Sequence, residues 1–142
     1  MFLSNKNKLV TILAVLIFPI VSYANVIDLF DAKGNGVAYI DFSDEKTIFL
    51  WTGEPVAYLD KESVYGFNGN HLGWFENGMI VDHDGDAICV RREKHPSPNF
   101  TEFKSFKEFK SFKSFKEFAP FKPSFTNQFS STSCKQHLAK GI

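Results

Sequence analysis

A glycine-led unit recurs four times between residues 34 and 91 and limits what this chain can fold into. Each copy has an aliphatic residue three positions after the glycine, then a small residue, then an aromatic or β-branched one. The glycines stand 19, 16 and 16 residues apart. Because one such short unit cannot bury its own apolar side chains, the copies must pack on one another. The equivalent residues are the glycines Gly34, Gly53, Gly69 and Gly85, the aliphatic residues Val37, Val56, Leu72 and Ile88, and the small residues Ala38, Ala57, Gly73 and Cys89.

Short apolar runs alternate with turn sequences throughout this region. Asn68-Gly69 is a strong hairpin signal, and glycine supplies the positive φ that tight turns require. No helical periodicity is present. A single hairpin with strands this short is marginal in water, so the hairpins must share a core, with the four aliphatic residues in one layer. The sequence predicts a small all-β domain, a pseudo-fourfold repeat of short β-hairpin units, with strands at 26–30, 37–42, 47–51, 56–59, 64–67, 71–75, 79–81 and 87–91.

Residues 1–24 have the pattern of a signal peptide. Lys6 and Lys8 give a positive start, 9–21 an apolar run, and Ser22-Tyr23-Ala24 a small-x-small cleavage site. The apolar run is shorter than the roughly 20 residues that span a bilayer. We therefore predict cleavage after Ala24 and export to a bacterial periplasm or the extracellular space.

The net charge of zero conceals a division of the chain. Residues 25–93 hold 5 basic and 13 acidic residues, a net charge of −8, whereas 94–142 hold 9 basic and 3 acidic residues, a net charge of +6. Such asymmetry indicates a globular part with an interaction tail. It is also what two parts that contact each other would show.

The two cysteines leave two states open. An oxidising compartment would permit a disulfide between Cys89 and Cys134. Cys89 occupies the small-residue position of its repeat, however, which favours a buried free thiol. Two cysteines provide neither a disulfide framework nor the spacing of a metal site.

The segment 94–142 contains a basic repeat of Phe, Lys and Ser or Glu. From Phe100 to Phe121 a phenylalanine stands at every third position. On an α-helix these side chains would wind around the axis, and on a strand they would alternate between faces. Only a three-residue turn, polyproline II or 3₁₀, aligns them. The composition predicts a low-complexity, disordered tail after a linker at 97–99, with 125–142 polar and irregular.

The alternative for this tail is an adhesive role. Lysines would attract an anionic surface while phenylalanines insert, as basic and aromatic residues do at lipid interfaces. Single-stranded nucleic acid offers similar chemistry, but export argues against it. The candidate contact residues are Phe103, Phe106, Phe109, Phe112, Phe115 and Phe118, with Lys104, Lys107, Lys110, Lys113 and Lys116.

Other motifs are better explained by structure than by chemistry. Asp82-His-Asp-Gly-Asp has closely spaced carboxylates, as a calcium site would, but its glycine is the repeat glycine of a turn. His71 has no serine or cysteine that the sequence places beside it, and the four histidines lack ligand spacing. Repeated aromatics (Trp51, Tyr58, Tyr65 and Trp74) could line a sugar site, although packing is their commoner role. We predict no catalytic residues, no metal and no cofactor.

Three segments carry a family resemblance. They are Leu50-Trp-Thr-Gly-Glu-Pro-Val-Ala-Tyr-Leu-Asp, Val64-Tyr-Gly-Phe-Asn-Gly-Asn-His-Leu-Gly-Trp-Phe-Glu-Asn-Gly and Asp82-His-Asp-Gly-Asp. Over about 28–92 the chain resembles the four-fold β-flower domain, a bacterial domain of repeated short β units about a central axis. The first copy departs by its longer loop, and the fourth by Cys89-Val90. The family has no established activity, so the resemblance implies a fold and no site residues.

These observations predict a non-enzymatic, exported β-repeat module at 25–93 with a basic aromatic tail. The tail is expected to contact an anionic membrane surface or an unidentified protein. The alternative is a carbohydrate or peptide binder that uses the repeated aromatics.

Overall fold

The computed structural model describes residues 14–19 and 25–142. The predicted signal peptide, 1–24, therefore lies outside the described residues except for 14–19, which form neither helix nor strand. No helix in the described ranges is both long and apolar enough to cross a membrane.

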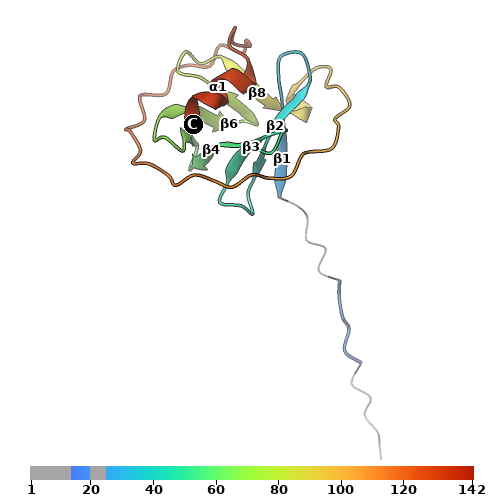
Figure 1. Cartoon of the computed structure of the whole chain (residues 1–142). Coiled ribbons are helices and arrows are strands. Elements are labelled where there is room, and N and C mark those ends of the chain that lie inside the picture. Colours follow the sequence, from blue (N-terminus) through green and yellow to red (C-terminus); the bar gives the residue numbers. More distant parts are fainter. Residues whose placement is uncertain (1–13, 20–24) are drawn as a thin grey trace, which may run out of the picture.

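Eight antiparallel strands close into a barrel in which each strand pairs with its neighbours in sequence (Figure 1). The first and last strands complete the ring through the pairs Leu29–Arg91 and Phe30–Val90. The predicted all-β repeat fold is confirmed, with strand bounds close to those expected. The strands are β1 (Val26–Phe30), β2 (Gly36–Asp41), β3 (Thr47–Leu50), β4 (Pro55–Asp60), β5 (Ser63–Gly66), β6 (His71–Glu76), β7 (Met79–Val81) and β8 (Ala87–Arg91).

A β-bulge marks each of the four repeats. In β4, Ile48 pairs with Ala57 and Phe49 with Pro55, so Val56 is the extra residue. Val37, Leu72 and Ile88 are skipped in the same way in β2, β6 and β8. Successive side chains of a regular strand point to opposite faces, but a bulge breaks that alternation. Val56 and Ala57 can therefore both be buried in the core.

One apolar cluster fills the barrel, and the four bulge residues all belong to it or pack against it. The prediction that they share a core is thus confirmed. Close packing between strands explains why a small residue follows the bulge. In the third repeat, a Cβ on Gly73 would overlap the carbonyl oxygen of Val81. The four repeat glycines have positive φ and lie in the turns at one end of the barrel, which we call the glycine end.

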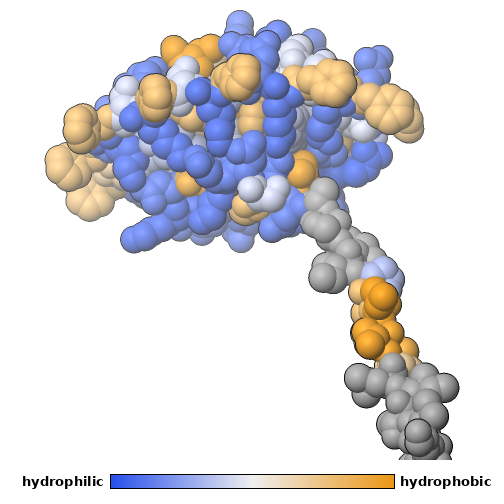
Figure 2. All heavy atoms as spheres, turned by 60° about the horizontal axis from the view of Figure 1, so that its bottom comes forward, coloured by the Kyte–Doolittle hydropathy of each residue, from blue (hydrophilic) through white to orange (hydrophobic). Residues whose placement is uncertain are grey.

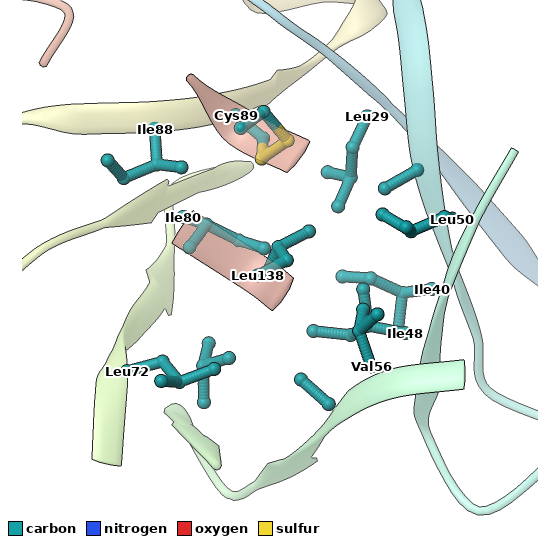
Figure 3. Packing of buried hydrophobic residues seen from close by; sticks show 14 of the residues in the cluster. Leu29, Ile40, Ile48, Leu50, Val56, Leu72, Ile80, Ile88, Cys89 and Leu138 are labelled. Carbon is teal, nitrogen blue, oxygen red and sulfur yellow. A yellow bond between two sulfur atoms is a disulfide. The ribbon is translucent and has the colours of Figure 1, made fainter. Parts of the chain in front are cut away.

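The C-terminal residues close the glycine end. The short helices α1 (Cys134–Leu138) and η2 (Ala139–Gly141) form a plug, residues 134–142. Leu138 is fully buried and lies among side chains from several strands (Figure 3). Asn68 in the third glycine turn donates from its backbone amide to Gly141 O at 3.1 Å and from its side chain to Lys140 O at 2.8 Å. The prediction that 125–142 is irregular is wrong for this segment.

Cys134 in the plug forms a disulfide with Cys89 in β8, with Cα atoms 5.4 Å apart. The buried free thiol that the repeat pattern favoured is therefore wrong. Cys89 faces the core at its small-residue position, and the plug brings the second sulfur to it.

Residues 97–126, which we call the belt, run around the outside of the barrel before the chain reaches the plug (Figure 1). The belt has no helix or strand between 98 and 126. It follows a short 3₁₀ helix, η1 (Arg92–Lys94), at the end of β8. Composition predicted a disordered tail here. That prediction is wrong for the belt, which is hydrogen-bonded to every repeat of the barrel.

The belt and the barrel share a fourfold register. Four belt amides, each nine residues after the last, donate to the four repeat glycine carbonyls at 2.7 to 3.0 Å. The belt carbonyls of Ser97, Phe106, Phe115 and Ser124 lie where a Cβ on each glycine would be. Glycine is thus required at these turns for close backbone approach as well as for φ. The amide pairs are Asn99–Gly34, Glu108–Gly53, Glu117–Gly69 and Thr126–Gly85.

A second set of belt amides also donates to barrel carbonyls, and prolines stand at the two ends of this set. Ser105 and Ser114 donate to Trp51 O and Phe67 O at 3.0 and 2.8 Å. The positions nine residues away on either side are Pro96 and Pro123, which have no amide hydrogen to donate. At the first of these, His95 Nε2 lies 3.1 Å from Ala32 O, the carbonyl equivalent to that of Trp51.

Candidate functional site

The belt separates its lysines from its phenylalanines. Three residues complete one turn of an extended polyproline-like segment, so each residue type keeps one direction. The phenylalanines from Phe100 to Phe121 point to solvent, and the lysines lie on the barrel. At the third position of the triplet, backbone amides such as those of Ser105 and Glu108 donate to barrel carbonyls. Sequence analysis had proposed that the candidate lysines and phenylalanines contact a partner together, whereas the structure turns them in different directions.

The lysines bind acidic residues of the barrel and its loops. Lys107 Nζ lies 2.7 Å from Asp41 and 3.0 Å from Asp44, and Lys110 lies 2.5 Å from Asp44. We call the outer surface of the barrel that these lysines contact the wall. It includes acidic residues such as Asp41 and Asp44 and aromatic residues such as Tyr39 and Tyr58. The remaining pairs are Lys104–Asp28 at 2.8 Å, Lys110–Glu45 at 3.5 Å, Lys113–Glu45 at 3.2 Å, Lys116–Asp60, and Lys122 with Glu62 at 2.9 Å and Glu76 at 2.6 Å.

Aromatic rings of the wall lie under the same lysines. Lys104 Nζ is 5.1 Å from the ring centre of Tyr39, and Lys113 is 4.4 Å from Tyr58, its repeat equivalent. Such distances permit cation–π attraction, which adds to that of the carboxylates. Lys107 over Phe49 at 4.8 Å and Lys116 over Tyr65 at 5.4 Å form a second equivalent pair, and Lys104 also covers Trp51 at 4.4 Å.

These contacts shift the acid–base equilibria of the wall. The hydrogen bond from Lys110 holds the pKa of Asp44 below its ordinary value. Burial alone would raise the pKa of Asp41, but hydrogen bonds from Lys107 and Ser43 outweigh it and lower the pKa. The hydrogen bond from Lys116 lowers the pKa of Asp60. The carboxylates therefore stay ionised and keep the lysines bound at neutral pH.

We expect the belt to loosen in acid. Because these carboxyls have lowered pKa values in the folded protein, their pairs stabilise the belt fully above the ordinary value of 3.8. That contribution is lost as the pH falls through the lowered pKa values. Protection factors from hydrogen exchange at the Ser105, Glu108 and Ser114 amides should fall as the pH drops below about 4, while those in β3 and β4 persist.

A neutral-pH variant separates the wall carboxylates from other acid effects. Asp44→Asn should lower belt protection at pH 7, because Lys107 and Lys110 both lose a charged partner. Belt protection that does not change from pH 7 to pH 2 would show that the ion pairs do not hold the belt.

Eight of the nine belt phenylalanines face solvent, and the ninth, Phe125 at the end of the belt, is half-buried. The eight from Phe100 to Phe121 are each at least 94% exposed. Figure 2 shows apolar side chains that protrude from a largely hydrophilic surface. Neighbouring rings are about 9 Å apart along a polyproline-like chain, so they do not cover one another. This row of rings is the phenylalanine face.

The aromatics proposed for a sugar site are covered. Tyr58, Tyr65 and Trp74 are each at most 6% exposed, and Trp51 is half-buried under Lys104. Between the belt and β4 a cleft of about 620 Å³ remains, lined by Tyr58, Leu59, Asp60 and belt residues 113–116. Of its charged groups, Asp60 and Lys116 are paired with each other, and Lys113 is paired with Glu45.

One cluster departs from the fourfold pattern. His71 Nδ1 lies 2.8 Å from His83 Nε2, and His71 Nε2 lies 3.1 Å from Ser63 Oγ. The expectation that no serine accompanies His71 is therefore wrong. Sequence reasoning missed Ser63 because the pairing of β5 with β6, in which Ser63 lies opposite Trp74 and Tyr65 opposite His71, brings its side chain to His71.

The cluster is a weak candidate for acid–base chemistry. Burial, together with the nearby charge of His83, lowers the pKa of His71 to about 4. A general base works best with a pKa near the working pH, so His71 is a poor acceptor for the Ser63 proton at pH 7. Its backbone amide also donates to the Glu117 carboxylate of the belt at 2.5 Å. The cluster thus contributes to holding the belt.

Two carboxylates of the acidic turn 82–86 have partners in the protein, and that of Asp86 accepts from Thr126 Oγ1 of the belt. Asp82 Oδ1 accepts from the amides of Asp84 and Asp86 at 3.0 and 2.9 Å, and Asp31 makes the same turn in the first repeat. In the part of the chain that the structure describes, no group of three or more histidine, cysteine or acidic residues could hold a metal ion.

Comparison with known proteins gives a family and no named relative. No curated protein and no solved structure matches this chain. Residues 27–138 match the family described as 4-fold beta flower protein. The match extends through the belt and into the plug, beyond the repeat region that carried the resemblance. The chain therefore belongs to the 4-fold beta flower protein family.

Proposed function

We propose that this protein is an exported, non-enzymatic binding module that attaches to a lipid membrane surface through its phenylalanine face. The observation that carries the proposal is the complete exposure of eight phenylalanines on a segment whose backbone and lysines are bound to the barrel. A fixed backbone presents the rings without a large cost of ordering on binding.

Apolar burial, rather than charge, would drive this attachment. Burying one phenylalanine contributes about 1.5–3 kcal/mol. Because the belt surrounds the barrel, a flat bilayer would meet only a few rings at once. The belt lysines already have carboxylate partners, so they would add less attraction to anionic lipid than free lysines would.

Export is supported by the leader pattern of 1–24 and by the disulfide. Bridges such as Cys89–Cys134 persist in oxidising compartments and are rare in the cytosol. The mass of the exported protein should correspond to a chain that begins at Asn25. An intact chain from Met1 in the membrane pellet would contradict cleavage.

Liposome flotation tests the phenylalanine face. The mature chain should bind both zwitterionic and anionic liposomes, with a residual fraction bound in 1 M salt, where the Debye length is only about 3 Å. Changing Phe106, Phe109, Phe112 and Phe115 together to serine should sharply reduce binding, because it removes half of the exposed rings.

The matched control replaces the same four residues by leucine, which keeps apolar area and should keep binding. Equal binding by the serine variant and the parent would show that the rings are not the contact surface. Binding to anionic liposomes alone, lost in 1 M salt, would assign the attachment to charge instead.

A further inference from the structure

The wall is a built receptor for an extended segment with lysine at every third position. Five consecutive lysines of the belt, Lys104 to Lys116, each reach an acidic partner, and four of them also lie over an aromatic ring. The backbone register is read as well, through the paired amides and carbonyls at each repeat glycine. The wall therefore recognises both the charge pattern and the nine-residue repeat.

These contacts do not depend on which copy of the chain supplies the belt. The belt leaves the barrel through η1 and a segment that contains Pro96 and Pro98. Beyond β8, belt and plug form one continuous unit that docks on the barrel through side chains and turn backbone. When a unit is exchanged between identical copies, every docking contact is remade, and only the hinge changes.

We propose that two copies of this chain exchange belts, so that the belt and plug of one occupy the wall and glycine end of the other. The Cys89–Cys134 bridge would then join the two copies. This inference concerns the inner side of the belt and is independent of membrane attachment by its outer side.

Exchange has to precede oxidation. Leu138 and both cysteines are buried in the finished protein, so a closed belt cannot leave its barrel without opening the core. Once the bridge forms, it fixes whichever arrangement the reduced chains reached. Two chains that fold close together thus have the opportunity to exchange, and dilute chains close their own belts.

Refolding with isotope labels tests the exchange on the natural chain. Equal amounts of ¹⁴N and ¹⁵N protein, both reduced and unfolded, are mixed, refolded and oxidised over a range of concentrations. The exchanged dimer should contain the Cys89 and Cys134 peptides linked with mixed labels, and its share should rise with concentration. Only same-label linked peptides at every concentration would overturn the proposal.

A composition-matched variant separates exchange from random disulfide pairing. Moving two lysines by one position (Lys110→Ser with Ser111→Lys, and Lys113→Ser with Ser114→Lys) keeps the charge but turns those lysines away from their partners. Because the same contacts hold a closed belt and an exchanged one, the ratio of mixed-label dimer to monomer should match that of the parent at equal concentration. A dimer share that rises when docking is weakened would show that the dimer forms by random disulfide pairing, which would also overturn the proposal.

Discussion

Replacing Cys134 by serine is expected to lower the free energy of unfolding by about 4 kcal/mol, as loop-closure entropy predicts for a bridge across this length of chain. The bridge joins residues 45 positions apart and closes the belt into a covalent ring with β8. Without it, the unfolded chain gains the freedom of that whole segment. Urea unfolding followed by tryptophan fluorescence would measure the loss.

Chemical reduction of the disulfide should lower the free energy of unfolding by the same amount. Dithiothreitol should shift the unfolding midpoint of the parent to that of Cys134→Ser and leave the variant unchanged. A parent whose midpoint is insensitive to full reduction, verified by thiol labelling of the unfolded protein, would contradict a stabilising role for the bridge.

Replacing Leu138 by alanine is expected to cost about 2–5 kcal/mol, the usual range for a buried leucine that leaves a cavity. Leu138 is fully buried in the cluster that fills the barrel, although it comes from a five-residue helix near the end of the chain. The rigid strands around it leave little room for the cavity to collapse. Thermal or urea unfolding of the full chain measures the effect.

Ile142→Ala is the matched control for the plug. Ile142 is 57% exposed, and substitutions at such positions usually change stability by less than about 0.5 kcal/mol. Similar losses for Leu138→Ala and Ile142→Ala would show that the plug is not seated in the barrel.

The barrel could be predicted from sequence because its information is local. Each strand is a short apolar run between turn residues, and Asn68-Gly69 specifies a hairpin between neighbours. All barrel strands pair with their neighbours in the chain except for the closing pair β1 and β8. The bulges at Val37, Val56 and Leu72 could not be predicted, but they explain why an aliphatic and a small residue stand side by side in each repeat.

The candidate site was only half predicted. The phenylalanine period indicated a three-residue turn, and the opposite charges of the two halves of the chain indicated contact between them. The sequence alone did not relate the nine-residue register of the belt to the 16- or 19-residue register of the barrel. In space the two periods coincide, since nine extended residues span one two-stranded unit.

By itself, therefore, the sequence determined the strands, the turns, the repeat and the composition of the belt. The tertiary structure alone decided that Lys107 meets Asp41, that Ser63 meets His71 and that Cys134 meets Cys89. The physical reason is the range of the interactions. Strand and turn preferences act between neighbours, whereas an ion pair such as Lys107–Asp41 joins residues that are 66 positions apart and becomes defined only when the closed barrel fixes where each carboxylate stands.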